Sequence, residues 1–508
     1  MTVAARARFA PALALFLVVL GGRLWLIDRA GSDLPLWDQW WGDFVTVVAP
    51  VADGRFQIES LTRPHNEHRL LYPRLGTLAL LKLSGRWEPR EALVVSALTR
   101  AIGLTVVFLV LGAGQSRKTR VTLLCLLAAL GALPVGVFNL LSGFQLPFFL
   151  GEPVAVLILM LLFRGGLTSG RVALAMCLLF LALLNLASVV ITSLGAATVL
   201  GLQAVLRRGP IRKAVAVAFV LCAFSVFAIL TTPSPSTSYR ARDIAEFARV
   251  FMQLAAWPFP EVPILGLLAL VPPFLLLHRL VTDREAPESS WFAFALCVTS
   301  WAQQAAIALM RGSFGSITFP QYVDGLWLTH LSGGLALVEA LRPRPGKPLG
   351  SEEKVLRLWT VWLVALISAD VALRGAPGLE SVRRAVEIRQ PAFAAALQTG
   401  HLEAFGAEAQ QVIQMELDKD YSFFDHPVGR FAVPGVVYLR LRNEPEKFLE
   451  ILPASLVGAP PSLVSRAMRV LTRLSPLFFF LGLMLMVQTF GFRLEGKDRN
   501  GAEPASAG

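Results

Sequence analysis

Charged residues and cysteine are both scarce in this chain. Of its 508 residues, 16% are charged and 55% are hydrophobic, and the mean hydropathy is +0.59. Soluble globular proteins carry about 25% charged residues, so an ordinary soluble protein is excluded. The four cysteines each lie inside an apolar run, without a partner at metal-site spacing. Neither a disulfide framework nor a zinc site is expected.

Motifs of soluble enzymes are missing as well. The sequence contains no Walker loop, no dinucleotide fingerprint and no G-x-S-x-G motif, so transport driven by nucleotide hydrolysis has no support. The formal net charge is +12, which in a soluble protein would suggest nucleic acid as a partner. Here a membrane topology explains it, because cytoplasmic loops of membrane proteins gather Lys and Arg.

Long apolar runs predict an all-α polytopic membrane protein. A spanning helix needs about 20 apolar residues, and about twelve such runs can be found. They are 9–27, 91–114, 121–139, 146–163, 172–187, 189–206, 213–231, 262–279, 291–310, 323–341, 357–373 and 473–492. No small-x-small cleavage site follows the first run, so we expect a retained first span and not a secretion signal.

Charge in the connecting loops orients these spans. The short loops of one set, such as 117–120, 207–213 and 342–354, are all basic, which places them in the cytoplasm. An even number of crossings then puts both termini in the cytoplasm. Three parts are expected: a transmembrane domain over 1–373, an extracytoplasmic helical segment over 374–471, and a last span with its cytoplasmic tail over 472–508.

The first outer loop, 28–90, begins with an aromatic and acidic stretch. Residues 37–43 contain three tryptophans, Asp38 and Asp43. An aromatic belt at the membrane interface is one interpretation. The other is a carboxylate whose pKa is raised by desolvation, which suits a general base. On an α-helix the two Asp residues would be about 140° apart and would not share a face, and Asp38 is the better flanked by aromatics.

A second polar stretch in this loop is Arg63–Pro64–His65–Asn66–Glu67–His68–Arg69. His65 and His68 would share a face if the stretch were helical. Three interpretations are open: a divalent metal site, for which a third or fourth ligand is not visible; a solvated loop; or a polar cluster that orients a phosphate or sugar.

Further polar residues interrupt or end apolar runs. Gln145 stands at a helix mouth, where an interhelical contact is the alternative to a binding role, and the deeper Glu152 must be paired, protonated or facing a cavity. Arg311 ends a span and offers a bidentate fork for phosphate; a snorkelling interface residue is the alternative. Arg240 is another outer cation. Residues 246–258 mix charged, aromatic and aliphatic groups, as in an interfacial helix.

These pieces resemble a known family. A short first span is followed by an outer loop with the aromatic-flanked Asp of 37–40, then by 65–69 and by Gly143–Phe144–Gln145. This order is similar to a group of bacterial membrane proteins within the multispanning C-type glycosyltransferases (the GT-C superfamily). In that group an Arg at a span end is followed by an Arg-Tyr pair; here Arg311 matches, and the pair reads Gln321–Tyr322.

The resemblance implies transfer of a sugar from a polyprenyl-phosphate donor, outside the bacterial inner membrane, to a lipid, glycan or protein acceptor. In such enzymes a first-loop Asp deprotonates the acceptor hydroxyl, and Asp38 matches it. Many relatives have two adjacent acids or acid-x-acid here, whereas this chain has Asp38–Gln39, so a divalent metal ion stays an open alternative. The expected substrate-binding residues are His65, Glu67, His68, Arg69, Gln145, Arg240, Arg311 and Tyr322.

Two other functions fit the sequence. A transporter or flippase of a lipid-linked anion would use Glu152 and the outer arginines, but it should show matching broken helices in two halves, and no internal repeat is visible. A non-catalytic membrane scaffold would retain the fold alone.

Overall fold

The computed structural model describes residues 3–36, 38–232, 239–313, 322–342, 352–406, 410–411 and 432–491. Within them the chain is helical, and the only extended pairing is an isolated bridge between His65 and His68. The predicted all-α class is therefore confirmed. The longer elements are α1 (Val3–Ala30), α3 (Leu71–Ser84), α4 (Pro89–Leu111), α5 (Arg117–Ala132), α7 (Leu146–Phe163), α8 (Ser169–Leu183), α9 (Val189–Val205), α10 (Ile211–Thr231), α11 (Ile244–Ala255), α12 (Gly266–Thr282), α13 (Glu288–Arg311), α14 (Val323–Leu341), α15 (Glu352–Asp370), α16 (Ala376–Thr399), α21 (Leu463–Arg473) and α22 (Ser475–Gly491).

Short elements connect these helices, and three of them matter for the site. They are η1 (Gln39–Val48), η2 (Ile58–Leu61) and η3 (Gly143–Gln145). The others are α2 (Ala49–Ala52), α6 (Val137–Leu140), η5 (Pro263–Leu265), η7 (Val371–Gly375), η8 (Leu402–Phe405), α18 (Gly435–Asn443), α19 (Pro445–Leu449) and α20 (Ala454–Val457).

Apolar helices long enough to cross a membrane are the dominant feature. Within the described ranges seven helices meet that requirement, and the pair α21–α22, bent by 46°, raises the number to eight if it forms one span. The seven are Phe9–Ala30, Pro89–Leu111, Gly143–Phe163, Ile211–Thr231, Pro263–Thr282, Glu288–Arg311 and Lys354–Thr399. The chain thus has the helices of a multi-pass membrane protein.

The remaining predicted spans coincide with shorter or more polar helices. The runs 172–187 and 189–206 form α8 and α9, which are apolar but short. The run 121–139 yields the 16-residue α5. The run 323–341 is α14, whose apolar sequence is interrupted by His330 and Glu339.

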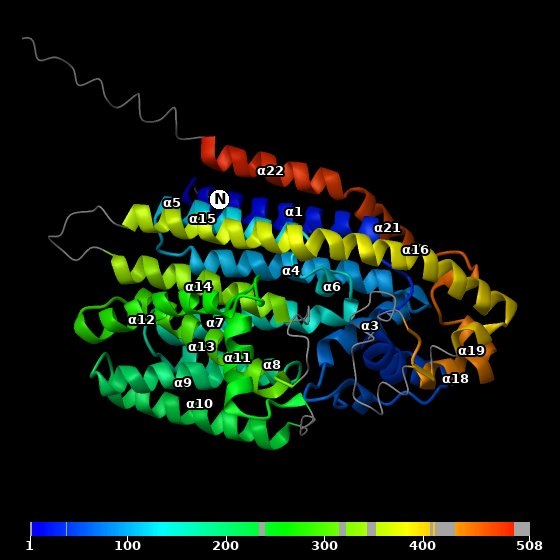
Figure 1. Ribbon diagram of the computed structural model, residues 1–508, viewed down its shortest axis with the longest axis horizontal. Helices are drawn as coiled ribbons and strands as arrows, with labels where there is room; N and C mark the ends of the chain where they lie inside the picture. Colours follow the sequence, from blue (N-terminus) through cyan, green and yellow to red (C-terminus); the bar gives the residue numbers. More distant parts are fainter. Residues whose placement is uncertain are drawn as a thin grey trace, which may run out of the picture.

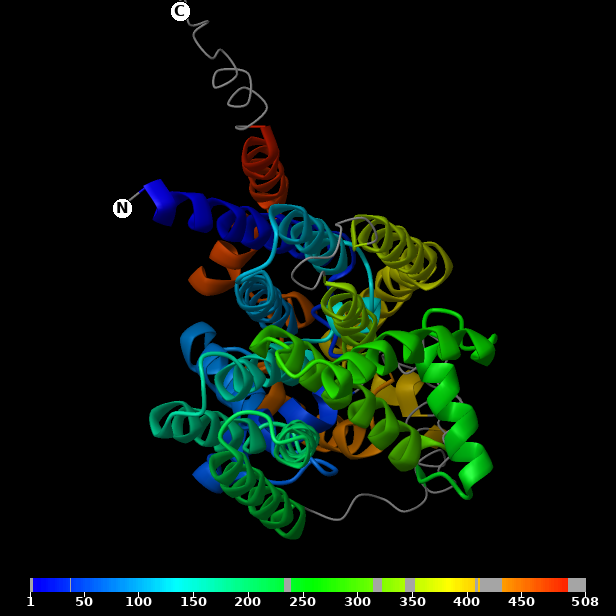
Figure 2. The same cartoon turned by 90° about the vertical axis from the view of Figure 1, so that its left-hand side faces the viewer.

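The long helices run side by side in a bundle, and the two long segments predicted on one face gather at one end of it. In Figure 1 this end of the bundle carries α3 from the first segment and α18 and α19 from the second. The start of α1 and the end of α22 lie toward the opposite end. Viewed along the helices, blue α1 and red α22 occupy one edge of the bundle and teal-green α10 the other (Figure 2).

Small residues let α1 and α22 approach closely. A Cβ at Gly482 would lie 2.7 Å from the Val18 backbone nitrogen, so any larger residue there would push the helices apart. Close backbone approach at glycines is a common way for helices to associate in membranes. The first and last helices are thereby joined along their length.

The stretch predicted to form an interfacial helix is helical, as α11. The Asp243 carboxylate caps it by accepting from the Glu246 backbone N–H at 2.7 Å, as N-cap Asp residues commonly do. In Figure 1 this helix runs across the direction of α13, against which it packs. The interfacial position of α11 stays a prediction.

A second apolar core, separate from that of the bundle, supports the first outer loop. Trp40 is completely buried there and makes edge contacts with Trp87 at 5.7 Å and with Phe393 of α16 at 6.2 Å between ring centroids. An aromatic belt facing lipid is therefore the wrong interpretation of Trp40. The core holds η1 against the segment that follows α15.

Candidate functional site

The aromatic and acidic stretch forms a ten-residue π-helix, η1, with Asp38 at its N-cap. π-Helices are rare, are mostly single-turn bulges and are frequent at functional sites. Their i→i+5 bonding is visible at the end of η1, where Ala49 N–H donates to Phe44 O. Five residues therefore bring the chain back to the same side, so Asp38 and Asp43 lie one turn apart on one side. The expected wide separation was wrong because it assumed α-helical geometry.

Three motifs that are distant in sequence meet at Asp38. The His65 Nε2 atom lies 3.9 Å from Asp38 Oδ1. The His65 ring makes an edge contact with Phe144 of η3, with centroids 5.1 Å apart. The Phe144 ring in turn fills the space that a side chain at Gly42 would need.

The polar stretch 65–69 contains a tight turn and not a helix. His65 and His68 exchange backbone hydrogen bonds of 2.8 and 3.0 Å. Asn66 between them has φ +52°, a left-handed conformation that Asn tolerates better than most residues. Directly opposed residues of an antiparallel pair place their side chains on one face. The two imidazoles are therefore on one side, although the helical geometry expected for them was wrong.

Arg74 of α3 holds this turn in place. Its side chain is buried, and its Nη1 atom donates to the Ser60 carbonyl at 3.3 Å, the Arg69 carbonyl at 3.0 Å and the Arg63 carbonyl. One guanidinium thus gathers backbone carbonyls from both sides of the turn. Arg74 was not among the predicted site residues; the available signal in the sequence was a lone Arg within the apolar sequence of α3.

The turn connects the Asp38 region to the end of α13. Arg311 forms a hydrogen-bonded ion pair with Glu67, and its Nε atom donates to the Tyr322 hydroxyl at 3.2 Å. Its guanidinium lies 5.6 Å from the centre of the Tyr239 ring, and His68 Nε2 lies 3.8 Å from Glu67 Oε1. A continuous cluster thus runs from Asp38 to Tyr322.

Burial shifts the acid–base properties of the cluster. It raises the pKa of Asp38 to about 7. It also raises the pKa of Asp43 to about 7; the nearby Asp38 charge adds to this shift, while a 3.0 Å hydrogen bond from Thr77 and the charge of Arg74 oppose it. Burial lowers the pKa of His65 to about 4, so this imidazole is neutral at pH 7. The carboxylates can therefore take up protons near neutral pH.

Glu67 has the opposite character. Burial disfavours its ionised form, but the neighbouring His68 and Arg311, the latter also through a hydrogen bond, outweigh burial and hold the pKa of Glu67 below the usual range. Burial lowers the pKa of His68, which leaves Arg311 as the cation that balances Glu67. The cluster therefore has a proton-accepting end at Asp38 and an ion-paired end at Arg311.

The other expected binding residues lie near the cluster without entering it. Arg69 Nη2 donates to the Thr231 carbonyl at 2.6 Å. Gln145 is buried beside Phe144, and its Oε1 atom has no hydrogen-bond partner among the described residues. The Arg240 side chain is exposed. The next residue, Ala241, donates its backbone N–H to the Leu309 carbonyl at 2.9 Å.

Glu152 is paired within the bundle, which was one of the outcomes expected for it. Its carboxylate accepts from Arg100 of α4 at 2.5 Å. The Arg100 guanidinium also lies 5.4 Å from the centre of the Trp327 ring. An ion pair of this kind is the usual way in which a charged residue is accommodated inside a membrane.

The described residues of the cluster do not form a metal site. Asp38, Asp43 and His65 are near one another, but no group of three or more His, Cys, Asp or Glu side chains within the described ranges could hold a metal ion. No chemical step is therefore assigned to a metal. What the cluster offers is a carboxylate that titrates near neutral pH, two imidazoles and a guanidinium.

Comparisons of the chain with protein-family models, with curated proteins and with solved structures found no match.

Proposed function

We propose that the chain is a membrane glycosyltransferase of the GT-C type, which moves a sugar from a polyprenyl-phosphate donor to an extracytoplasmic hydroxyl acceptor. The observation that carries the proposal is the continuous cluster from Asp38 to Arg311. Such a reaction needs a base where the acceptor hydroxyl loses its proton and a cation where the phosphate leaves. The cluster offers one of each at its two ends.

In the proposed reaction Asp38 takes the proton of the acceptor hydroxyl. The oxygen forms a bond to the anomeric carbon on the face opposite the phosphate, whose bond breaks, and the configuration inverts. Arg311 stabilises the negative charge that develops on the departing polyprenyl phosphate. The neutral His65, 3.9 Å from Asp38, orients the acceptor by a hydrogen bond.

We further propose that the chain crosses the membrane about twelve times, with α5, α8, α9 and α14 included among the spans. Helices α5 and α9 have many buried residues, which suits positions inside the bundle, whereas α8 exposes Leu174, Phe180 and Leu181, which suits a position facing lipid. The chain start and the end of α22 lie toward the same end of the bundle, which supports an even number of crossings. The basic loops support a cytoplasmic location for that end, and the proposed membrane is the bacterial inner membrane.

The two other functions gain no support from the described contacts. A transporter that used Glu152 as a binding group would first have to break its ion pair with Arg100. A non-catalytic scaffold would not need the acid–base pair of Asp38 and His65. An assay of sugar transfer separates a scaffold from an enzyme.

The test is transfer by the purified, reconstituted chain from a panel of polyprenyl-phosphate sugars, with and without chelator. Arg311→Gln should abolish transfer, whereas the exposed Arg240→Gln should retain most of it. Equal transfer by wild type and Arg311→Gln would contradict the role of the cation. Transfer from no donor in the panel would count against the enzyme and favour the transporter or the scaffold.

A further inference from the structure

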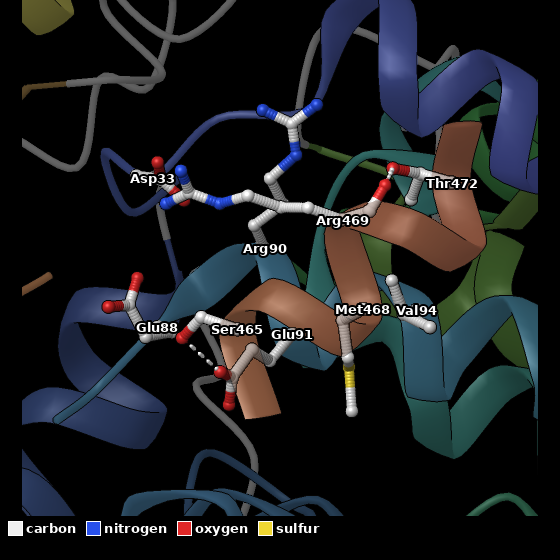
Figure 3. A pocket seen from close by; sticks show the side chains of 9 residues that line it. All are labelled: Asp33, Glu88, Arg90, Glu91, Val94, Ser465, Met468, Arg469 and Thr472. Atoms are coloured by element: carbon white, nitrogen blue, oxygen red, sulfur yellow. Dashed lines mark hydrogen bonds between the residues drawn. The ribbon is translucent and has the colours of Figure 1, made fainter. Parts of the chain in front are cut away.

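A small hollow with charges of both signs lies away from the Asp38 cluster. It is formed by α4, by α21 and by the segment that follows α1 (Figure 3). Its polar lining consists of Asp33, Glu88, Arg90, Glu91, Ser465 and Arg469. It shares no lining residue with the candidate site described above.

Part of this lining has an evident structural role. Glu91 accepts hydrogen bonds from Ser84 at 2.6 Å and from Ser465 at 2.7 Å, one at each oxygen. Glu88 accepts from the Ala454 backbone N–H at 3.0 Å. These contacts attach the segment that contains α20 and the start of α21 to the beginning of α4.

Two lining groups are left without such partners. Asp33 is only 5% exposed; its Oδ2 atom accepts from Ser455 at 2.8 Å, but its Oδ1 atom has no hydrogen-bond partner in the described part of the chain. Arg469 is half-buried, and its guanidinium makes no hydrogen bond or ion pair with another described residue. Figure 3 shows the Arg469 side chain extending from α21 over the hollow in the direction of Asp33. A buried carboxylate oxygen without a hydrogen-bond donor is unfavourable. A ligand that donates a hydrogen bond to Asp33 would therefore be stabilised in the hollow.

The charges decide which ligand fits. A divalent cation is disfavoured, because both Glu91 oxygens are already bonded and two arginines line the same hollow. A simple anion would satisfy Arg469 but leave Asp33 unpaired. A zwitterion with a primary ammonium and a phosphate satisfies both, since the ammonium donates to carboxylates and the phosphate accepts from guanidinium groups.

The position of the hollow indicates that this zwitterion belongs to a lipid. Helix α21 carries exposed apolar residues, with Leu463 83% and Val470 53% exposed, and it bends by 46° into the apolar α22. An amphipathic helix at the end of an apolar span lies at the membrane interface, where phospholipid headgroups are. Val94 and Met468 add an apolar side to the hollow.

We propose that this hollow binds the headgroup of a zwitterionic phospholipid with a primary ammonium group. The hollow has room for about one water-sized group, so the ammonium enters it and donates to Asp33 and Glu88. The phosphate stays at the mouth of the hollow and accepts from Arg469, because the Arg90 guanidinium already donates to the Ile27 and Asp28 carbonyls. The acyl chains lie along Met468 and the exposed apolar face of α21. This inference goes beyond sugar transfer and does not depend on it.

The test is native mass spectrometry of the full chain with phosphatidylethanolamine, phosphatidylcholine or phosphatidylglycerol at equal concentration. We expect one phosphatidylethanolamine to be retained about tenfold more strongly than either of the others, the size of effect that one charge-assisted hydrogen bond supplies. Phosphatidylcholine keeps the positive charge but lacks ammonium N–H donors, and phosphatidylglycerol lacks the cation. Equal retention of the three lipids would overturn the inference.

Matched variants connect the preference to the hollow. Arg469→Gln should remove it, whereas Arg473→Gln, an exposed position on the same helix α21 outside the hollow, should not. Asp33→Asn keeps an acceptor for Ser455 and should lose the preference while the protein remains folded by size-exclusion chromatography. If Arg469→Gln and Asp33→Asn keep the preference for phosphatidylethanolamine, the lipid does not bind in this hollow. If soluble phosphoethanolamine at equal concentration displaces the lipid, the hollow recognises a free phosphoethanolamine and not a phospholipid.

Discussion

Arg311 and Glu67 stand 244 positions apart in the chain, yet their side chains form a hydrogen-bonded ion pair. The pair joins the end of α13 to the first outer loop and thereby brings a cation from the bundle to the loop that carries Asp38. Both side chains are mostly buried, so each depends on the other for its charge. The pair is therefore structural as well as a candidate for phosphate binding.

This pair predicts strong coupling in stability. Glu67→Gln and Arg311→Gln should each lower the free energy of unfolding by roughly 1–3 kcal/mol, because each leaves a charged partner without its counter-charge. The double variant should cost less than the sum of the two. Thermal unfolding in detergent measures all four species, and strict additivity would show that the pair contributes nothing.

Gly42 predicts a steric effect on the site. A methyl group at Gly42→Ala would overlap the Phe144 ring, so Phe144 and the His65 ring against it must shift. We expect a loss of about 1–3 kcal/mol in unfolding free energy and a large loss of transfer. Gly76→Ala is the matched control, because a Cβ there meets nothing within 4 Å, and its helical position predicts unchanged or slightly higher stability. Equal behaviour of the two variants would contradict the packing.

Asp43 predicts how stability depends on pH. Its pKa is about 7 in the folded chain and near its ordinary value when unfolded, so the folded state holds more protons between about pH 4 and pH 7. Its contribution to stability is therefore greatest at low pH and is lost as the pH rises to about 7. Asp43→Asn removes this loss, so the melting temperature of the variant relative to wild type should increase between pH 5 and pH 7.5. A difference that does not change with pH would contradict the raised pKa.

Asp38 predicts the pH dependence of transfer. Burial raises the pKa of this carboxyl to about 7, and a base acts only in its ionised form. The kcat/KM should rise about tenfold per pH unit below pH 7 and level off above it. A profile that is flat from pH 5 to pH 8 would exclude Asp38 as the titrating base.

Much of the bundle is predictable from the sequence because hydropathy reports directly on membrane helices. The runs around 9–27, 213–231 and 291–310 each lie within a long apolar helix, and the stretch at 246–258 contains most of α11. Alternate connecting loops are basic, and this pattern also predicted that the polar motifs lie together on the other side of the bundle. These features depend on local composition, which can be read directly from a sequence.

The geometry within the site was not predictable, because tertiary packing determines it. No propensity distinguishes the π-helix η1 from an α-helix, and the burial of Trp40 depends on Phe393, far along the chain. The turn at 65–68 depends on Arg74, whose role appears only when its carbonyl partners are seen. From its position, the second outer segment (374–471) is also predicted to cap the site and bind the acceptor. Its aromatic and acidic stretch 421–427 lies outside the described part of the chain.

The most direct test of the central claim is the transfer rate of Asp38→Asn beside Asp53→Asn. Both substitutions remove a carboxylate from the first outer loop, and Asp53 is bonded instead to Arg55 and Arg440. The account predicts that Asp38→Asn folds normally and loses at least about 100-fold in kcat, the usual contribution of a general base, while Asp53→Asn retains transfer. Normal transfer by folded Asp38→Asn would contradict the account.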